Sequence, residues 1–207
     1  MDGSAAMTAF WDQERRQVTE NIRRFGVHLT YIFGAQDEDA GELCRCCRGP
    51  GVVAGEDGDE AEAATDGFAE LFVRTGGDRA LLPPRTTLPF CYTTGLFGAG
   101  HAELVVLGLG HEQSAALLNQ VTHRVLDHGM DLTPGELLEV EGRSLLVEEL
   151  HLSGMILFGT HDFYERPPWE PLPAHQLTWA DEQGRFPWDD GHDPGTWWQP
   201  RPGQWRA

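Results

Sequence analysis

Apolar residues recur at helical spacing near the start of the chain. Residues 8–24 carry charges between the members of one apolar stripe, so they predict a helix. The stripe consists of Phe10, Trp11, Val18 and Ile22. Gly26 follows where a helix should end, because glycine adopts the left-handed conformation of a helix C-terminus easily. Residues 27–33 (VHLTYIF) are rich in β-formers and predict a strand.

A second block of regular patterning begins at Leu88. Residues 88–97 (LPFCYTTGLF) predict a strand that ends at a glycine-rich turn, and the apolar run 103–109 (ELVVLGL) predicts a central strand buried on both faces. Because only about five turn residues separate the two strands, we expect an antiparallel hairpin. Residues 110–128 then predict a helix that ends at Gly129. Its apolar stripe is Leu117, Leu118, Val121 and Val125.

The last third of the chain is less regular. Residues 137–150 predict one or two strands, and 153–165 predict a helix capped by Ser153 and stopped by Pro167. Residues 175–179 (HQLTW) alternate like a strand. The segment 168–207 holds six of the seven Trp and many Pro, so we expect an extended strap on the sheet. The predicted fold is a single α+β domain, with a mostly antiparallel sheet and packed helices.

One stretch interrupts this pattern. Residues 37–70 contain eleven acids and two Arg, which is half of the formal net charge of −18. Such a stretch buries too little apolar surface to offset its ordering entropy. We therefore interpret residues 35–87 as an acidic, largely disordered insert.

The charge also limits the partners. A net charge of −18 disfavours binding to nucleic acid and to anionic membranes. All fifteen basic residues are Arg, so a phosphate-binding P-loop, which needs Lys, is excluded. The N-terminus has no secretory pattern, and the cysteines form no spaced disulfide framework. We expect a cytoplasmic protein.

The cysteines of the insert are weak metal candidates. Cys44 and Cys47 form one C-x-x-C pair, with Cys46 between them. A structural zinc site usually has four ligands, and the only other cysteine is Cys91. We interpret the pair as incidental, with weak metal capture or reversible oxidation as the alternative.

His101 and Glu103 are the main candidates for chemistry, because they lie at the mouth of the predicted hairpin. Tyr92 and Thr94 share one strand face and are expected to approach them. A His beside a carboxylate can act in acid–base catalysis or bind a cation. The alternative is that both side chains satisfy backbone groups of the turn.

Two other polar clusters are interpreted as solvated. On the helix 110–128, His123 and Asp127 share a face, whereas His128 is expected to point elsewhere. Residues 189–193 (DDGHD) lack the spacing of a calcium loop and are typical of a turn.

Three segments resemble a bacterial family, the domain of unknown function 4262. They are LPFCYTTGLFGAGHAELVVLGL (88–109), ALLNQVTHRVLDHG (116–129) and HQLTWADEQGRFPWDDG (175–191) with Gln199-Pro200 beyond it. The closing motif is the most specific part; it comprises Gln176, Leu177, Trp179, Asp181, Gly184, Phe186, Pro187 and Trp188. Ala102 stands where the family usually has Pro, and the acidic insert looks like an addition. The resemblance implies no activity.

Two functional hypotheses follow. In the first, the protein is a non-catalytic binding or accessory protein for a small molecule or peptide. Its groove would be lined by Tyr92, Thr94, Trp179, Phe186 and Trp188, with polar tips from His101, Gln176 and Asp181. The alternative is that these aromatic side chains simply cover the core. In the second, it is a small hydrolase or metal-assisted enzyme that uses His101 with Glu103 or Asp181. The sequence specifies neither a cofactor nor an oligomeric state.

Overall fold

The computed structural model of the chain describes residues 3–34, 73–74, 76–193 and 198–207. The acidic stretch with its three cysteines therefore lies largely outside the described residues. The described residues 76–87 form a short 3-10 turn, η1 (Arg79–Leu81), and an isolated bridge between Arg85 and Arg206.

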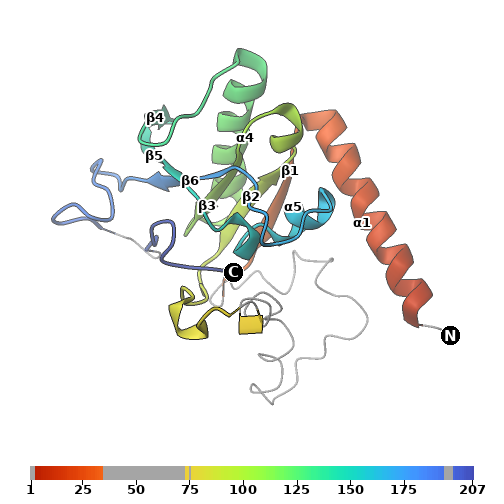
Figure 1. The fold of residues 1–207 in the computed structure, drawn as a ribbon. Coiled ribbons are helices and arrows are strands. Elements are labelled where there is room, and N and C mark those ends of the chain that lie inside the picture. The colour runs from red at the N-terminus through yellow and green to blue at the C-terminus, as the bar shows by residue number, and fades with distance from the viewer. Residues whose placement is uncertain (1–2, 35–72, 75, 194–197) are drawn as a thin grey trace.

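The centre of the fold is a six-stranded sheet (Figure 1). Its strands are β1 (His28–Ile32), β2 (Phe90–Thr94), β3 (Glu103–Leu107), β4 (Leu137–Val140), β5 (Arg143–Glu149) and β6 (Ala174–Trp179). They lie in the order β1-β2-β3-β6-β5-β4, and only the central β3–β6 pair is parallel. This mostly antiparallel sheet confirms the predicted α+β class.

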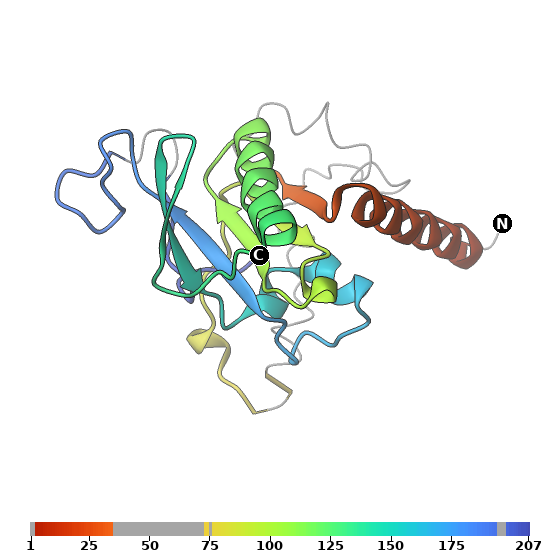
Figure 2. The same ribbon diagram turned by 90° about the horizontal axis from the view of Figure 1, so that it is seen from above.

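Each face of the sheet carries its own core, because side chains alternate between the two faces of a strand. On one face, α4 (His111–His128) packs its stripe of Leu117, Leu118, Val121 and Val125 against Leu104, Val106 and Trp179. On the other face, Phe90, Tyr92 and Val105 contact Leu150, the segment 155–157 and Trp205 from the tail. In Figure 2, α1 (Gly3–Phe25) ends beside the edge strand β1, and its N-terminal end extends away from the body.

The expected helix over 153–165 is corrected by the structure. The segment forms a 3-10 turn, η3 (Ser153–Met155), and a separate short helix, α5 (Phe158–Phe163). Ser153 does not cap a helix. Its hydroxyl accepts a hydrogen bond from the Leu172 N–H at 2.9 Å and is fully buried, so it holds the incoming tail instead.

The C-terminal tail lies across the sheet as a strap. The Gln176 side chain donates to the Pro200 carbonyl at 2.8 Å and accepts from Trp205 Nε1 at 3.0 Å. Arg201 donates to Glu148 on β5 through Nε at 2.8 Å. These polar contacts, together with the insertion of Trp205 beside Phe90, fix residues 199–206 on the body.

None of the helices in the described ranges is long and apolar enough to cross a membrane.

Candidate functional site

Glu103 lies at the start of β3 and is sealed inside the protein. Its Oε2 accepts from the Thr93 hydroxyl at 2.6 Å, and its Oε1 accepts from the backbone N–H groups of Gly95 and Phe97 at 2.9 and 3.0 Å. Burial raises the pKa of Glu103, and these hydrogen bonds partly offset that effect. With no exposed surface, the carboxylate holds the turn between β2 and β3 and does not face a substrate.

The other hairpin candidates do not assemble around Glu103. Within the residues that the structure describes, the His101 side chain makes no hydrogen bond or ion pair. The Tyr92 hydroxyl accepts from the Gly159 N–H at 3.1 Å, and the Thr94 hydroxyl pairs with Thr160 at 2.7 Å. Tyr92 and Thr94 therefore connect β2 to α5 and leave His101 alone at the turn.

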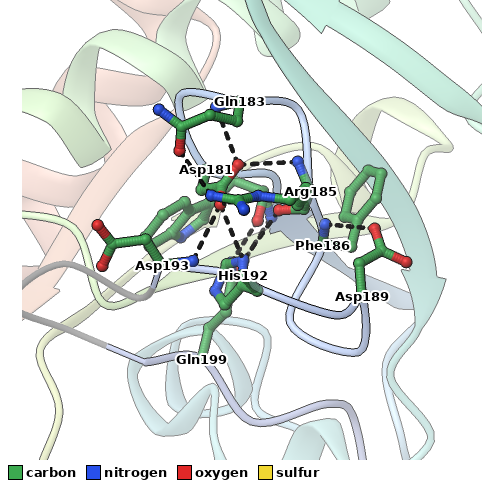
Figure 3. A network of polar contacts seen from close by, with 9 residues as sticks. Asp181, Gln183, Arg185, Phe186, Asp189, His192, Asp193 and Gln199 are labelled. Carbon is green, nitrogen blue, oxygen red and sulfur yellow. Dashed lines mark hydrogen bonds and ion pairs between the residues drawn. The ribbon is translucent and has the colours of Figure 1, made fainter.

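Asp181 follows β6 and organises the loop after it (Figure 3). Its Oδ1 accepts from the N–H groups of Gln183 and Arg185, and its Oδ2 accepts from Arg185 Nε and the Asp193 N–H, all at 2.9 Å. Burial of the carboxyl would raise the pKa of Asp181, but these donors outweigh it and lower the pKa to about 2. Both carboxylate oxygens are therefore saturated by the protein's own groups.

His192 completes this loop. Its Nδ1 lies 2.9 Å from the Arg185 carbonyl and 3.7 Å from Asp181 Oδ2. Its Nε2 is buried without a hydrogen-bond partner in the described part of the chain. The ring is thus oriented by the loop and closed off from solvent.

The predicted groove is not formed. Tyr92 belongs to the core on one face of the sheet and Trp179 to the core on the other, so the sheet separates them. Glu103 pairs with Ala174 at the start of β6, whereas Asp181 follows the other end of this strand, roughly 20 Å away at about 3.3 Å per residue.

The remaining predicted groove residues have structural contacts of their own. Trp179 is buried and donates from Nε1 to the Leu107 carbonyl at 2.8 Å. Phe186 and Trp188 stack with ring centroids 5.1 Å apart, and the Arg201 guanidinium lies 4.6 Å from the Trp188 ring centroid. With Gln176 buried under the strap, the closing motif builds the fold more than it lines a site.

A cleft of about 680 Å³ does exist elsewhere, between the end of α1, the start of β1 and α4. Its lining residues are Asn21, Arg24, Phe25, Gly26, Val27, His28, Leu29, Asn119, Thr122, His123, Leu126 and Asp127. The volume falls in the range of roughly 300–1,000 Å³ that is usual for small-molecule sites. We take this α1/α4 cleft as the candidate functional site.

Glycine 26 makes the close packing at the floor of the cleft possible. Its φ of +85° is the left-handed conformation that ends α1, and its N–H donates to the Ile22 carbonyl at 2.8 Å. A Cβ at this position would lie 2.4 Å from Leu126 Cδ1 of α4. The turn from α1 into β1 therefore rests directly on α4, and Val27 and Leu126 form an apolar floor.

Polar residues also line the cleft, some with protein partners and some without. Asn21 Nδ2 donates to His28 Nδ1 at 2.9 Å, which leaves the proton of His28 on Nε2. Burial lowers the pKa of His28, so the ring is neutral near pH 7. The Thr122 hydroxyl is buried and, within the described ranges, has no hydrogen-bond partner. The Asn119 side chain likewise makes no hydrogen bond to described residues.

The rim of the cleft is charged. Arg24 stacks its guanidinium over the Phe25 ring at 5.1 Å. His123 Nδ1 and Asp127 Oδ2 lie in contact across one helical turn. The prediction that His128 points away from His123 is wrong, because their ring centroids lie 5.0 Å apart in an edge-to-face arrangement.

Sequence reasoning missed this cleft, although it had treated His123 and Asp127 as a pair. The sequence does contain one sign of the cleft: a glycine that ends a helix, Gly26, is followed by a polar residue at the start of a strand, His28. What it lacked was the docking of that turn on α4, which depends on packing between segments roughly a hundred residues apart.

Metal ligation finds no support in the described ranges, where no group of three or more His, Cys, Asp or Glu residues is placed to hold an ion. The candidates Cys44, Cys46 and Cys47 lie outside those ranges. Cys91 is buried, which raises the pKa of its thiol to about 12.

Comparison with known proteins gives a family and no activity. The family model described as a domain of unknown function (DUF4262) matches residues 67–193, which is more than half of the chain. A search of curated proteins and a search of solved structures each returned no match. The match contains the α4 wall of the cleft, whereas α1 and β1 precede it. The chain belongs to the DUF4262 family.

Proposed function

We propose that this member of the DUF4262 family is a non-catalytic binding protein that holds a small polar molecule in the α1/α4 cleft. The observation that carries the proposal is the Thr122 hydroxyl, which is buried in the cleft wall with no partner among the described residues. A buried hydroxyl without a hydrogen bond is costly, roughly 1–3 kcal/mol, so such groups call for a reason. A ligand that accepts from Thr122 supplies one.

The surroundings of Thr122 support this proposal. The Asn119 amide, exposed on α4 three residues before Thr122, is also unengaged by described residues and lines the same cleft. The apolar side chains of Val27 and Leu126 belong to the same lining. An apolar surface with a few convergent polar groups is the usual chemistry of a small-molecule pocket.

The proposal is tested by screening small organic molecules with ¹H–¹⁵N correlation spectra. Ligands are expected to shift the backbone amides of residues 21–29 and 119–127. Asn119→Trp should abolish these shifts, because Asn119 is exposed on α4 and a Trp ring there fills the cleft. Gln120→Trp is the matched control, on the same helix but outside the lining. Ligands that bind elsewhere, or that bind Asn119→Trp unchanged, would refute the proposal.

The alternative is a small hydrolase or metal-assisted enzyme at the hairpin. Its support is the pKa of Glu103, which burial raises. The pKa of the neighbouring Tyr164 is also raised, mainly by its own burial and secondly by the charge of Glu103. A sealed carboxylate leaves no room for a substrate, so we rank this function second. Hydrolysis of p-nitrophenyl acetate by the wild type that disappears in both Glu103→Gln and His101→Ala would reverse the ranking.

A further inference from the structure

We infer that α1 joins two copies of this chain. The N-terminal half of the helix packs against the same half of a second copy, and the two helices run antiparallel. This inference goes beyond the proposed function, because it concerns another surface and needs no ligand. It follows from the place where α1 leaves the body, from the apolar side chains that are exposed there, and from the absence of charge in that part of the sequence.

One apolar stripe runs along α1 and is covered at one end only. Met7, Trp11, Val18 and Ile22 follow one another at intervals of three, four or seven residues or their sums, which keeps them on one side of a helix. Ile22 packs on the body, because a Cβ added at Gly95 would lie 3.2 Å from its Cγ1. Toward the N-terminus the helix extends past the body (Figure 2). There Met7 and Trp11 are 55% and 57% exposed. The uncovered end of the stripe is therefore a candidate contact surface.

The charge pattern identifies the partner as a second copy. Residues 3–11 (GSAAMTAFW) contain no charged residue, although acids outnumber bases by 33 to 15 in the chain. A partner of opposite charge finds nothing to pair with on this segment. Two copies of an acidic chain repel each other over most of their surfaces, but here they can meet without bringing like charges into contact. The segment is thus complementary to itself.

Three features favour the antiparallel arrangement. A two-fold axis pairs the same surface of both copies, and antiparallel helices oppose their macrodipoles. The C-terminal end of α1 leads into the body, so antiparallel helices place the two acidic bodies at opposite ends of the pair. A pair centred near Ala9 sets Met7 opposite the second copy's Trp11. It also brings Glu14 toward the start of the other helix, where acid is favourable and where the first turn has none of its own.

The exposed side chains supply nearly enough area for a specific dimer. Phe10 and Trp11 meet edge-to-face with ring centroids 5.3 Å apart, so they form one aromatic unit. A buried aromatic side chain covers about 150–250 Å², and the four rings of two copies therefore account for roughly 600–1,000 Å². With the two Met7 side chains, the interface approaches the roughly 1,200 Å² at which specific interfaces begin. We therefore expect a reversible dimer with a dissociation constant in the micromolar range.

Sedimentation equilibrium of the full chain, from about 1 μM to about 1 mM, tests the dimer. Trp11→Gln should raise the dissociation constant at least tenfold, because a central aromatic residue carries much of the energy of an interface. Trp198→Gln is the matched control, since Trp198 is 58% exposed but lies in the C-terminal tail. Circular dichroism checks that both variants keep their helix content. A wild type that stays monomeric throughout, or an equal loss in both variants, would overturn the inference.

Mixed variants test the orientation. Met7→Glu and Trp11→Arg should each be monomeric, and their mixture should form dimers again, because opposite charges then face each other across the antiparallel pair. A mixture of Met7→Glu with Met7→Arg should stay monomeric. The reverse result would mean that the helices run parallel, and would overturn the antiparallel arrangement.

An exposed apolar helix end can also bind a lipid surface. Sedimentation of the chain with phosphatidylcholine vesicles separates this occupant from a second copy. We expect the wild type to remain in the supernatant. Sedimentation with vesicles that is lost in Trp11→Gln, from a wild type that is monomeric without them, would assign the stripe to a membrane and overturn the inference.

Discussion

Two polar regions of this protein look alike in composition and differ in what their groups are bonded to. Around Asp181, both carboxylate oxygens accept two hydrogen bonds each from the protein. In the α1/α4 cleft, Thr122 and Asn119 have no hydrogen-bond partner among the described residues, and Arg24 has no carboxylate. The saturated carboxylate gives its loop rigidity, even though Nε2 of the neighbouring His192 has no partner among the described residues, whereas unengaged groups that line a cleft are available to a ligand.

The contrast explains why the closing motif is a poor guide to the site. Asp181, Trp179 and Gln176 are the most distinctive residues of the chain, and all three use their polar atoms to fix β6, the following loop and the tail. These distinctive residues are therefore required by the fold and do not mark a binding site. The cleft, by contrast, is built from common helix residues whose significance depends on what they face.

The largest effect on stability is expected in the loop around Asp181. Asp181→Ala removes the acceptor of four hydrogen bonds and leaves their donors without a partner in the loop. The midpoint temperature of thermal unfolding should fall by several degrees. The amides of residues 183–193 should lose protection in hydrogen exchange. Asp190→Ala, an exposed change in the same loop, is the control. Equal behaviour of the two variants would show that Asp181 does not organise the loop.

A second comparison uses two glycines that end helices. Gly26 and Gly129 both have positive φ, but a Cβ at Gly26 would meet Leu126 at 2.4 Å, while nothing lies within 4 Å at Gly129. Gly129→Ala is expected to cost about 1 kcal/mol from the backbone conformation alone. Gly26→Ala should cost roughly 2 kcal/mol, because the added Cβ must also displace the end of the Leu126 side chain. Urea denaturation measures both, and equal costs would contradict the packing at the cleft floor.

Two buried threonines compare the regions directly. The Thr178 hydroxyl donates to Glu148 and accepts from Gln176 at 3.1 Å, whereas that of Thr122 is unpartnered in the described structure. Thr178→Val should destabilise the protein by about 1–3 kcal/mol, since it strands two polar partners. Thr122→Val should instead stabilise the unliganded protein by roughly 1–3 kcal/mol, because it removes the cost of a buried hydroxyl without a partner. A large loss for Thr122→Val in denaturant titrations would mean that its hydroxyl has a structural partner.

The smallest effect is on the pH dependence of stability. Burial lowers the folded-state pKa of His28 below its usual 6.5, so the unfolded chain binds more protons just below pH 6.5. The contribution of His28 is therefore complete above about pH 6.5 and is lost as the pH falls through its folded pKa. For Asp181, with a folded pKa of about 2 against 3.8, the loss occurs only below about pH 4.

Denaturation midpoints measured from pH 7 to pH 3 separate these two windows. His28→Gln should reduce the loss of stability just below pH 6.5 and leave the loss below pH 4 unchanged. Asp181→Asn should do the reverse. Because burial also lowers the pKa of His161 and His175, the upper window is expected to shrink in His28→Gln without vanishing. An unchanged upper window would mean that His28 is not protected from protonation by the fold.

Much of the architecture was predictable because local patterns determine it. The stripe of Leu117, Leu118, Val121 and Val125 gives α4, and the short turn before Glu103 gives the β2–β3 hairpin. The segment 153–165 was mispredicted as one capped helix. Its serine hydroxyl is used by Leu172, and no local pattern reveals a partner nineteen residues away.

The site was less predictable, for a physical reason. A polar side chain such as Glu103 or Asp181 looks the same in sequence whether its oxygens are free or saturated. Its state is decided by backbone N–H groups, which every non-proline residue carries. The unengaged state of Thr122 and Arg24 likewise depends on which neighbours the fold supplies. The sequence shows which residue types a site contains, but it does not show whether their polar atoms are left free by the rest of the protein.

The position of β6 has a consequence for how the chain reaches its native state. Before residues 174–179 are in place, the sheet exists as two separate antiparallel pieces, β1-β2-β3 and β4-β5. Each piece exposes an open edge, at β3 and at β5. During synthesis the N-terminal piece and α4 are available first. The joining strand β6 is thus the last strand to be synthesised, and it lies at the centre of the sheet. Folding intermediates should be most prone to aggregation before it is in place. Changes in β6 should therefore lower the yield of folded protein more than changes in either edge strand.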